Sequence, residues 1–298
     1  MKCGVVAVVG KPNVGKTTLM NHVVGEKVGI VSPRPQTTRN PIVGIANRPG
    51  AQIVFRDSPG IHKPKTKLGS IMVERAVATL HDADVVLFVA DVSRMPNEED
   101  KRIAQLISLH ANASMVVALN KMDRLRPEHV REHYEAFEAL TAPSELLYTN
   151  ALSGENVAKL VDLLIERLPE REPMYDDPDL YTTQTQREMA AELIREQVLI
   201  ATREEVPHGV AVALESWEDA DPADEKPITR ISAAIVVERK SQKPILIGRG
   251  GSMLKRIGTE ARKEIERIVG NQVYLELFVK VRENWRDKPA LLREYGIL

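Results

Sequence analysis

The sequence has little of three features that would each define a class of protein. Its single cysteine, Cys3, excludes an internal disulfide framework and favours a reducing compartment. No apolar run approaches the ~20 residues that a membrane-spanning helix needs, and the short apolar start runs into a glycine-rich loop unlike a signal peptide. The formal net charge is only −1, so nucleic-acid binding would require a local basic patch. These absences predict a cytoplasmic protein.

The first part of the chain has the pattern of an α/β domain. A length of 298 residues predicts two domains, and up to residue 170 apolar strands alternate with amphipathic helices. The continuous apolar runs 85–90 and 115–119 are typical of strands buried on both faces of a parallel sheet, and 53–55 is a shorter strand. Residues 156–168 carry one apolar face at helical spacing. We therefore predict a doubly wound α/β domain over 1–170, with ligands at the carboxyl ends of its strands.

The pattern changes after a segment rich in proline and acidic residues. Residues 171–183 are predicted to be a linker, and 184–298 a smaller α+β domain. Its expected elements are a helix at 184–201, strands near 210–214 and 231–237, an exposed loop at 218–225, a helix at 254–269 and a strand at 273–281. The alternation in the last strand is expected to bury Val273, Leu275, Leu277, Val279 and Val281 on one face.

The stretch Gly10–Thr17 matches a phosphate-binding loop, G-x-x-x-x-G-K-[ST], placed between an apolar strand and a helix start. Glycines let backbone N–H groups surround the α- and β-phosphates, and the helix N-terminus adds partial positive charge. Lys16 is expected to neutralise the β/γ oxygens, and Thr17 to offer its hydroxyl to Mg²⁺. The predicted phosphate-contacting residues are Asn13, Val14, Gly15, Lys16, Thr17, Thr18 and Gly60.

Asn120–Asp123 follows the strand at 115–119 and predicts that the base is guanine. The Asp123 carboxylate can accept from both N1–H and the N2 amino group of guanine, which adenine cannot match. An unpaired buried carboxylate would cost several kcal/mol, so adenine should be rejected. Asn120 is expected to brace the loop, and the Lys121 stem to lie over the purine.

Asp57–Gly60 supplies a D-x-x-G motif at the end of the strand at 53–55. Asp57 can hold Mg²⁺ through a water molecule, and the Gly60 N–H can bond the γ-phosphate. The motif is common in unrelated sequences, so its weight comes from its position between the two motifs described above.

Together the three motifs resemble the translation-factor-like branch of P-loop GTPases. The resemblance implies that Thr38, rather than Thr37, reaches Mg²⁺ and the γ-phosphate, and that the Ala151 N–H bonds guanine. Asn150 replaces the usual serine there and would brace the loop. The resemblance also implies that Asn13 helps to hold a K⁺ ion beside the β/γ bridge, which would act as an arginine finger does.

The residue that follows Gly60 is expected to limit the rate of hydrolysis. Ile61 occupies the position where Ras-like enzymes carry a water-orienting glutamine, so we expect slow intrinsic hydrolysis. We interpret His62 as a solvated loop residue rather than a base. The predicted catalytic residues are Asn13, Lys16, Thr38 and Gly60.

Gly248–Gly251 forms a G-x-x-G loop among basic residues in the second domain. With the α-β-β-α-β order, it resembles a KH domain of type II, whose loop clamps the backbone of about four nucleotides. The residues predicted to contact RNA are Ile247, Gly248, Arg249, Gly250, Gly251, Lys255 and Arg256. The candidates for an apolar groove that holds bases are Ile231, Ile235, Ile247 and Leu254.

A GTPase followed directly by a KH domain resembles the bacterial ribosome-assembly GTPases over essentially the whole chain. The resemblance implies GTP, GDP and Mg²⁺ as ligands, the 3′ end of 16S ribosomal RNA and the small ribosomal subunit as partners, and no DNA. It also implies peripheral association with the inner membrane. One alternative is a GTP-gated module of another class, such as a tRNA-modification or membrane-tethered GTPase. A P-loop kinase or ATPase is a more distant alternative, which Asp123 opposes.

Overall fold

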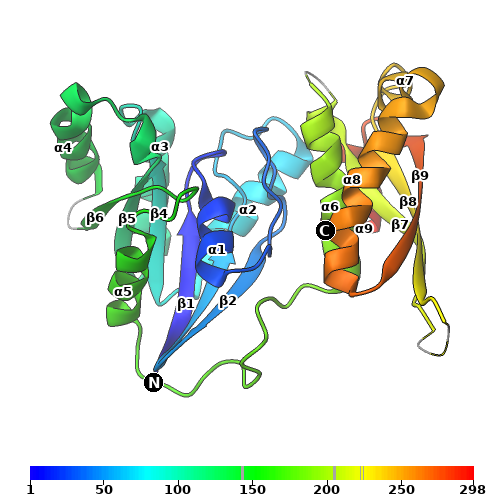
Figure 1. Ribbon diagram of the computed structural model, residues 1–298. Coiled ribbons are helices and arrows are strands. Elements are labelled where there is room, and N and C mark those ends of the chain that lie inside the picture. Colours follow the sequence, from blue (N-terminus) through cyan, green and yellow to red (C-terminus); the bar gives the residue numbers. More distant parts are fainter. Residues whose placement is uncertain (142–143, 204–205, 222, 224) are drawn as a thin grey trace. The chain divides into compact units, whose positions relative to one another are not determined.

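The computed structural model divides into two compact units (Figure 1). It describes residues 1–141, 144–203, 206–221, 223 and 225–298. The first unit comprises residues 1–29, 38–65 and 69–183, and the second comprises 30–37, 66–68 and 184–298. The contacts thus assign residues 171–183 to the first unit and give the second unit two short segments from the N-terminal half. The domain limits taken from the sequence stay a proposal.

A six-stranded sheet forms the centre of the first unit, in the order β2-β3-β1-β4-β5-β6. The strands are β1 (Lys2–Val9), β2 (Ile42–Arg48), β3 (Ala51–Asp57), β4 (Val85–Asp91), β5 (Ser114–Asn120) and β6 (Glu145–Thr149). Every neighbouring pair is parallel except β2 and β3, which are antiparallel. The carboxyl ends of the five parallel strands therefore meet at one edge, where ligands are expected in such sheets.

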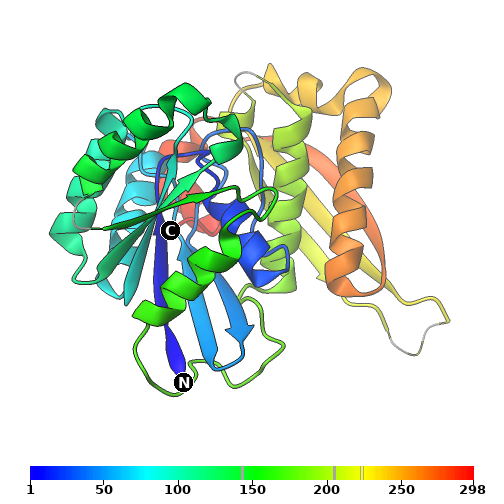
Figure 2. The same ribbon diagram turned by 60° about the vertical axis from the view of Figure 1, so that its left-hand side comes forward.

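Helices cover both faces of this sheet (Figures 1 and 2). The helices are α1 (Lys16–Val24), α2 (Lys67–His81), α3 (Glu98–His110), α4 (Val130–Thr141) and α5 (Val157–Arg167). Val6 and Val8 of β1 pack in one core with α1 and α5. Ala7 and Val9 pack in a second core with α2, α3 and α4. Alternate residues of β1 thus face opposite cores, which is why the strand is a continuous apolar run.

The antiparallel edge strand β2 was not expected from the sequence. Its apolar run is interrupted by Gly44, so it does not show the pattern of a strand buried on both faces. Gly44 lies against α1, because an added Cβ would be 3.0 Å from the sulfur of Met20. The predicted α/β domain is confirmed, and β2 adds an antiparallel strand at this edge of its sheet.

Residues 171–183 contain no helix or strand but are fastened to the first unit. The buried Gln52 side chain accepts hydrogen bonds from the N–H groups of Met174 and Tyr175, at 2.8 and 3.1 Å. Arg171 donates from Nε to the carbonyl of Cys3 at 2.8 Å. The predicted linker is thus held along the sheet for part of its length.

A three-stranded sheet in the order β7-β8-β9 lies in the second unit. Helices α6 and α8 pack against each other and share one hydrophobic core with these strands (Figures 1 and 2). Its elements are α6 (Gln186–Ala201), β7 (Ala211–Glu218), β8 (Ile228–Val237), α7 (Gln242–Ile247), α8 (Ser252–Val269), β9 (Gln272–Val281) and α9 (Pro289–Glu294). Trp285 is fully buried and donates from its indole nitrogen to the carbonyl of Gly209 at 2.9 Å. Among the residues that the structure describes, no helix combines the length and apolar character needed to cross a membrane.

Three expectations for the second unit need correction or completion. The short helix α7 lies before the glycine loop, where the sequence predicted no helix. On β9 only Val273 and Val279 are buried, whereas Leu275, Leu277 and Val281 are half-buried. The expected exposed loop at 218–225 includes positions 222 and 224, which lie outside the described residues.

Candidate nucleotide and RNA sites

The loop between β1 and α1 has a backbone that only glycine permits at two positions. Gly10 and Gly15 have φ of 156° and 103°. A Cβ on Gly10 would lie 2.3 Å from the carbonyl oxygen of Val89, and one on Gly15 would lie 2.3 Å from the Asn120 side-chain nitrogen. Asn13 also has a positive φ, of 62°. The chain can therefore turn tightly into the N-terminus of α1, as a phosphate-binding loop must.

The ammonium group of Lys16 is held at the centre of this loop. Its Nζ donates to the carbonyls of Gly10 and Lys11, at 3.3 and 3.0 Å. Burial lowers the pKa of Lys16, and the charge of Asp57 opposes that shift in part. A buried cation with neutral acceptors is stabilised strongly by an anion such as phosphate.

Thr17, Thr38 and Asp57 meet at the carboxyl end of β3. The hydroxyl oxygens of Thr17 and Thr38 are 3.0 Å apart, and Thr17 also donates to Oδ2 of Asp57. Asp57 is fully buried, and within the described part of the chain its Oδ1 has no hydrogen-bond partner. Burial raises the pKa of Asp57 to about 6, although Lys16 and both threonine hydroxyls act in the opposite direction. The cluster presents oxygen donors only, which are the ligands that Mg²⁺ prefers.

Gly60 and Ile61 place the second phosphate-binding motif against the first. A Cβ on Gly60 would lie 2.7 Å from the backbone nitrogen of Pro12, so no other residue fits without a shift. Ile61 is buried and its N–H donates to the carbonyl of Gly10 at 3.2 Å. His62 is tied to the backbone, with Nδ1 2.9 Å from the carbonyl oxygen of Gly60. The Ile61 side chain therefore packs in the core and has no polar group for a water molecule.

Asn120 joins the phosphate loop to the predicted guanine loops. Its side-chain nitrogen donates to the carbonyl of Val14 at 2.8 Å. Its side-chain oxygen accepts from the Ala151 N–H at 2.9 Å. The N–H that we expected to bond guanine is thus bonded to Asn120 in this structure, and its contact with guanine stays a prediction. Asn150 braces the same loop as expected, because its side-chain oxygen accepts from the N–H groups of Leu152 and Ser153.

Lys121 and Asp123 lie on the turn after β5. Nζ of Lys121 is 2.7 Å from Oδ2 of Asp91. Burial alone would raise the pKa of Asp91, but hydrogen bonds from Lys121 and Ser93 outweigh it and the pKa is lowered. The Asp123 side chain is 45% exposed, with its carboxylate 3.9 Å from Nε of Arg124. The carboxylate is therefore accessible to a base.

Two acidic residues that no sequence motif predicted support this site. Asp91 pairs in register with Asn120 across β4 and β5, which places it beside Lys121. Asp100 is fully buried and holds Nζ of Lys11, in the phosphate loop, at 2.6 Å. Asp100 also closes a capping box with Asn97 at the start of α3. The Asn-x-x-Asp spacing signals the helix start, but nothing in the sequence signals the bond to Lys11.

The loop between α7 and α8 has three glycines with positive φ: Gly248, Gly250 and Gly251, at 74°, 56° and 81°. A Cβ on Gly248 would lie 2.7 Å from the backbone nitrogen of Met253, so this turn is closely packed. Gly250 and Gly251 have open space where a Cβ would be. Arg249, between Gly248 and Gly250, is exposed. A backbone without side chains beside an exposed cation suits close approach of a phosphate chain.

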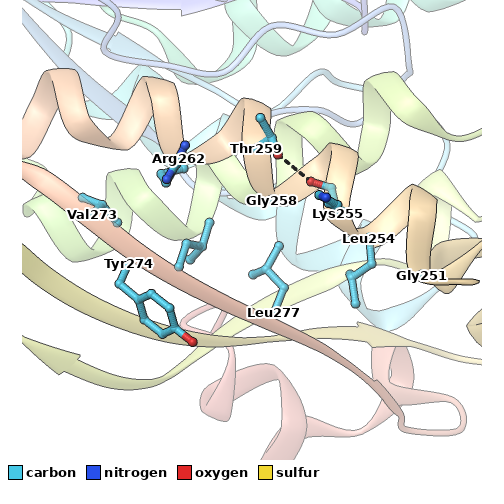
Figure 3. A pocket seen from close by; sticks show the side chains of 10 residues that line it. Gly251, Leu254, Lys255, Gly258, Thr259, Arg262, Val273, Tyr274 and Leu277 are labelled. Carbon is cyan, nitrogen blue, oxygen red and sulfur yellow. Dashed lines mark hydrogen bonds between the residues drawn. The ribbon is translucent and has the colours of Figure 1, made fainter.

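A groove of about 550 Å³ lies beside this loop, between α8 and β9 (Figure 3). Leu254 and Leu277 point into the space between helix and strand, and Gly258 leaves room there. The groove is lined by Gly251, Leu254, Lys255, Gly258, Thr259, Arg262, Val273, Tyr274, Leu275 and Leu277. The half-buried state of Leu275 and Leu277 follows from this position.

Two residues expected in the groove lie elsewhere. Ile231 and Ile235 are 1% and 0% exposed, and they pack in the core of the second unit. Both belong to the central strand β8, whereas the groove is formed at the edge strand β9. Ile247 is also absent from the lining, so of the four candidates only Leu254 lines the groove.

Comparisons with known proteins match a GTPase family first along the chain and a KH domain family after it. Residues 5–121 match a family described as 50S ribosome-binding GTPase, and residues 205–286 match the KH domain family. The GTPase Era of Heliobacterium modesticaldum is 44% identical over 296 residues, which cover 99% of this chain and 97% of the relative. A crystal structure of Era in complex with MgGDPNP and nucleotides 1506–1542 of 16S ribosomal RNA is 41% identical, with a TM-score of 0.93 over 100% of this chain and 99% of that one. A point variant of Aquifex aeolicus Era bound to GDP·AlF4⁻ is 40% identical, with the same TM-score and coverage.

Proposed function

Since this chain belongs to the Era family of GTPases, we propose that it binds the 3′ end of 16S ribosomal RNA and acts in maturation of the small ribosomal subunit. As a member of the family it is a GTPase. The proposal rests on the groove between α8 and β9, which lies beside the loop of glycines with positive φ. It is supported by the 41% identity to an Era whose structure was solved with that end of the RNA. The KH match disfavours a GTPase of another class, which would not need this loop.

The nucleotide site fits GTP or GDP with Mg²⁺. Asp57 Oδ1 is buried and has no hydrogen-bond partner among the described residues. With the adjacent hydroxyls of Thr17 and Thr38 it forms a set of oxygens that suits Mg²⁺. We assign Thr17 and Thr38 as its ligands and Asp57 as its partner through water. When bound, the metal offsets negative charge on the β/γ oxygens.

The remaining assignments follow the geometry of the loops. The backbone of Asn13–Thr18 and the Gly60 N–H would bind the phosphates, with Lys16 as the buried counter-charge. The exposed carboxylate of Asp123 would bind guanine, while Asn120 holds the two loops together. Asn120, Lys121, Asp123 and Ala151 thus remain the proposed guanine site.

The buried Ile61 supports slow intrinsic hydrolysis, because no side chain at this position can orient water. A monovalent cation beside Asn13 would add positive charge next to the β/γ bridge, as an arginine finger does. We therefore keep K⁺ as a proposal. An Asn13→Ala protein whose hydrolysis rate responds to K⁺ as the parent's does would contradict it.

The RNA site combines a backbone clamp with charge. Gly250 and Gly251 leave space for phosphates, and Arg249, Lys255 and Arg256 are exposed around them. The groove provides apolar surface for unstacked bases, with Tyr274 at its edge. Cytoplasmic location remains an expectation from the composition, and peripheral association with the inner membrane remains one from the family resemblance.

The proposal is tested by RNA binding of the full chain in its GDP and GTP-analogue states. We expect an RNA with the 3′-end sequence of 16S ribosomal RNA to bind more tightly than an RNA of the same composition in shuffled order. Gly250→Asp, which places a carboxylate in the clamp, should weaken binding about tenfold or more by repelling phosphate. Fluorescence anisotropy measures both.

The chain offers a matched control for that variant. Gly50, in the turn between β2 and β3, also has a positive φ, of 75°, and open space at its Cβ position. Gly50→Asp therefore introduces the same charge and backbone constraint outside the clamp and should leave RNA affinity unchanged. Equal affinity for the shuffled RNA, or equal losses in the two variants, would overturn the proposed RNA site while leaving the GTPase assignment intact.

A further inference from the structure

A cluster of two histidines and a glutamate lies on α4, outside the nucleotide and RNA sites. His129 ends a short 3-10 turn (Pro127–His129), and Glu132 and His133 follow in the first turn of α4. One potential ligand atom from each of the three residues lies within 4.8 Å of the others. Spacings of three and four residues place side chains on the same helix face.

His133 is already oriented as a metal-binding histidine would be. It is 6% exposed, and its Nδ1 lies 2.7 Å from the carbonyl oxygen of Val92. A neutral ring that donates from Nδ1 carries its lone pair on Nε2. A backbone carbonyl that fixes the ring of a ligating histidine in this way is the usual outer partner in metal sites.

The other two residues complete the donor set and can move. The His129 ring stacks on that of His133 with centroids 5.4 Å apart and an interplanar angle of 12°. Nδ1 of His129 is 3.2 Å from Oε2 of Glu132, and the two side chains are 42% and 61% exposed. Zinc bonds of about 2.0–2.2 Å need ligand atoms roughly 3.4 Å apart, so modest rotation of these exposed side chains would bring the three atoms into range.

We propose that His129, Glu132 and His133 form a zinc-binding site with a fourth position open to water. Two imidazole nitrogens and one carboxylate are a donor set typical of Zn²⁺, whereas Mg²⁺ and Ca²⁺ prefer oxygen alone. The site links α4 to Val92, whose N–H donates to the carbonyl of Asn120 at 3.0 Å. Bound zinc would therefore fasten α4 to the strand end that carries the guanine loop.

The site can be tested on the full chain loaded with GDP and saturating Mg²⁺, so that the magnesium ligands are occupied. Calorimetric titration with ZnCl₂ should show one zinc per chain, and Co²⁺ should give the visible absorption of a nitrogen-ligated site. His129→Gln and Glu132→Gln change exposed side chains and should each weaken zinc binding about tenfold or more. Zinc should also raise the thermal midpoint of the parent, but not that of His129→Gln.

His110→Gln provides the matched control. His110 and His81 form another histidine pair, with ring centroids 5.5 Å apart, but no three-residue ligand group includes them in the described part of the chain. This variant should bind zinc as the parent does, and unchanged GDP affinity in every variant shows that the fold is intact. A parent that takes up no zinc, or equal losses in His110→Gln and His129→Gln, would overturn the proposal.

Discussion

At the level of single residues, the candidate nucleotide site holds two charged groups that are buried before any ligand arrives. Lys16 and Asp57 are both buried. Burial lowers the pKa of Lys16 and raises that of Asp57, so it favours the neutral form of each group. Holding a cation and a carboxylate in place without water is costly in the free protein. Because both side chains are already in place, they need little reorganisation when phosphate and metal bind. Preorganised groups of this kind stabilise charge that develops during the reaction.

The pKa of Asp57 predicts how magnesium affinity depends on pH. Because that pKa is raised to about 6, the carboxyl binds a proton below this pH and the proton competes with the metal. Magnesium affinity of the GDP-bound protein should therefore fall as pH decreases, by about tenfold between pH 7 and pH 5. Titration of GDP-bound protein with Mg²⁺ at several pH values measures this.

The nucleotide's own phosphates also titrate in this range, so the comparison needs a variant without the carboxyl. Asp57→Asn keeps both threonine hydroxyls and should bind Mg²⁺ weakly, with only the pH dependence of GDP itself. If parent and variant lose affinity in parallel between pH 7 and pH 5, Asp57 does not titrate in this range.

The sequence pointed to candidate site residues but not to the residues that hold them in place. Lys16, Asp57 and Asp123 could be proposed because each has a fixed spacing from a glycine or a strand end. Asp91 and Asp100 could not, because their partners Lys121 and Lys11 are distant in sequence. Which carboxylate meets which lysine is decided by strand register and helix packing, and a single sequence contains neither.

At the level of elements, strands and helices with unbroken apolar patterns were predictable and interrupted ones were not. The runs at 85–90 and 115–119 became the interior strands β4 and β5. Strand β2 was missed because Gly44 interrupts it, and Gly44 is required there by the close approach of α1. Helix α7 was missed because Pro244 and a run of aliphatic residues disguise a six-residue helix. At β2, tertiary packing thus overrides the local pattern.

Substitutions in the groove between α8 and β9 can separate the stability of α8 from RNA binding in the groove. Gly258 lies on α8 and lines the groove, and a Cβ there would contact Leu277 at 3.4 Å. Gly258→Ala should stabilise the helix by about 1 kcal/mol and change RNA affinity little. Gly258→Leu should also favour the helix but fill the groove, weakening RNA binding about tenfold or more by displacing a base.

Chemical denaturation and fluorescence anisotropy on the same preparations separate the two effects. Loss of RNA affinity in Gly258→Leu without loss of unfolding free energy would support the groove as the base site. Undiminished RNA affinity in that variant would show that bases bind elsewhere.

At the level of the whole molecule, the chain crosses between its two units next to Thr38, a proposed magnesium ligand. Residues 30–37 belong to the second unit: the Glu196 carboxylate accepts from the Val31 N–H at 2.9 Å, and Arg195 donates to the carbonyl of Thr37. Thr38, the next residue, belongs to the first unit and meets Thr17. The sequence predicted two domains but placed residues 30–37 in the first, because nothing in that segment indicates that it packs with the second unit.

This crossing predicts that nucleotide state affects RNA affinity through Glu196. If GTP in place of GDP repositions Thr38, the preceding segment is displaced against α6, to which Glu196 fastens it. The ratio of RNA dissociation constants in the GDP and GTP-analogue states should therefore differ from one in the parent. In Glu196→Gln this ratio should move toward one by up to about tenfold, since one charged hydrogen bond is weakened.

Glu218→Gln makes the same charge change at the exposed end of β7 and should keep the parent's ratio. An unchanged ratio in Glu196→Gln, measured by anisotropy with both nucleotides, would show that the coupling does not pass through residues 30–37.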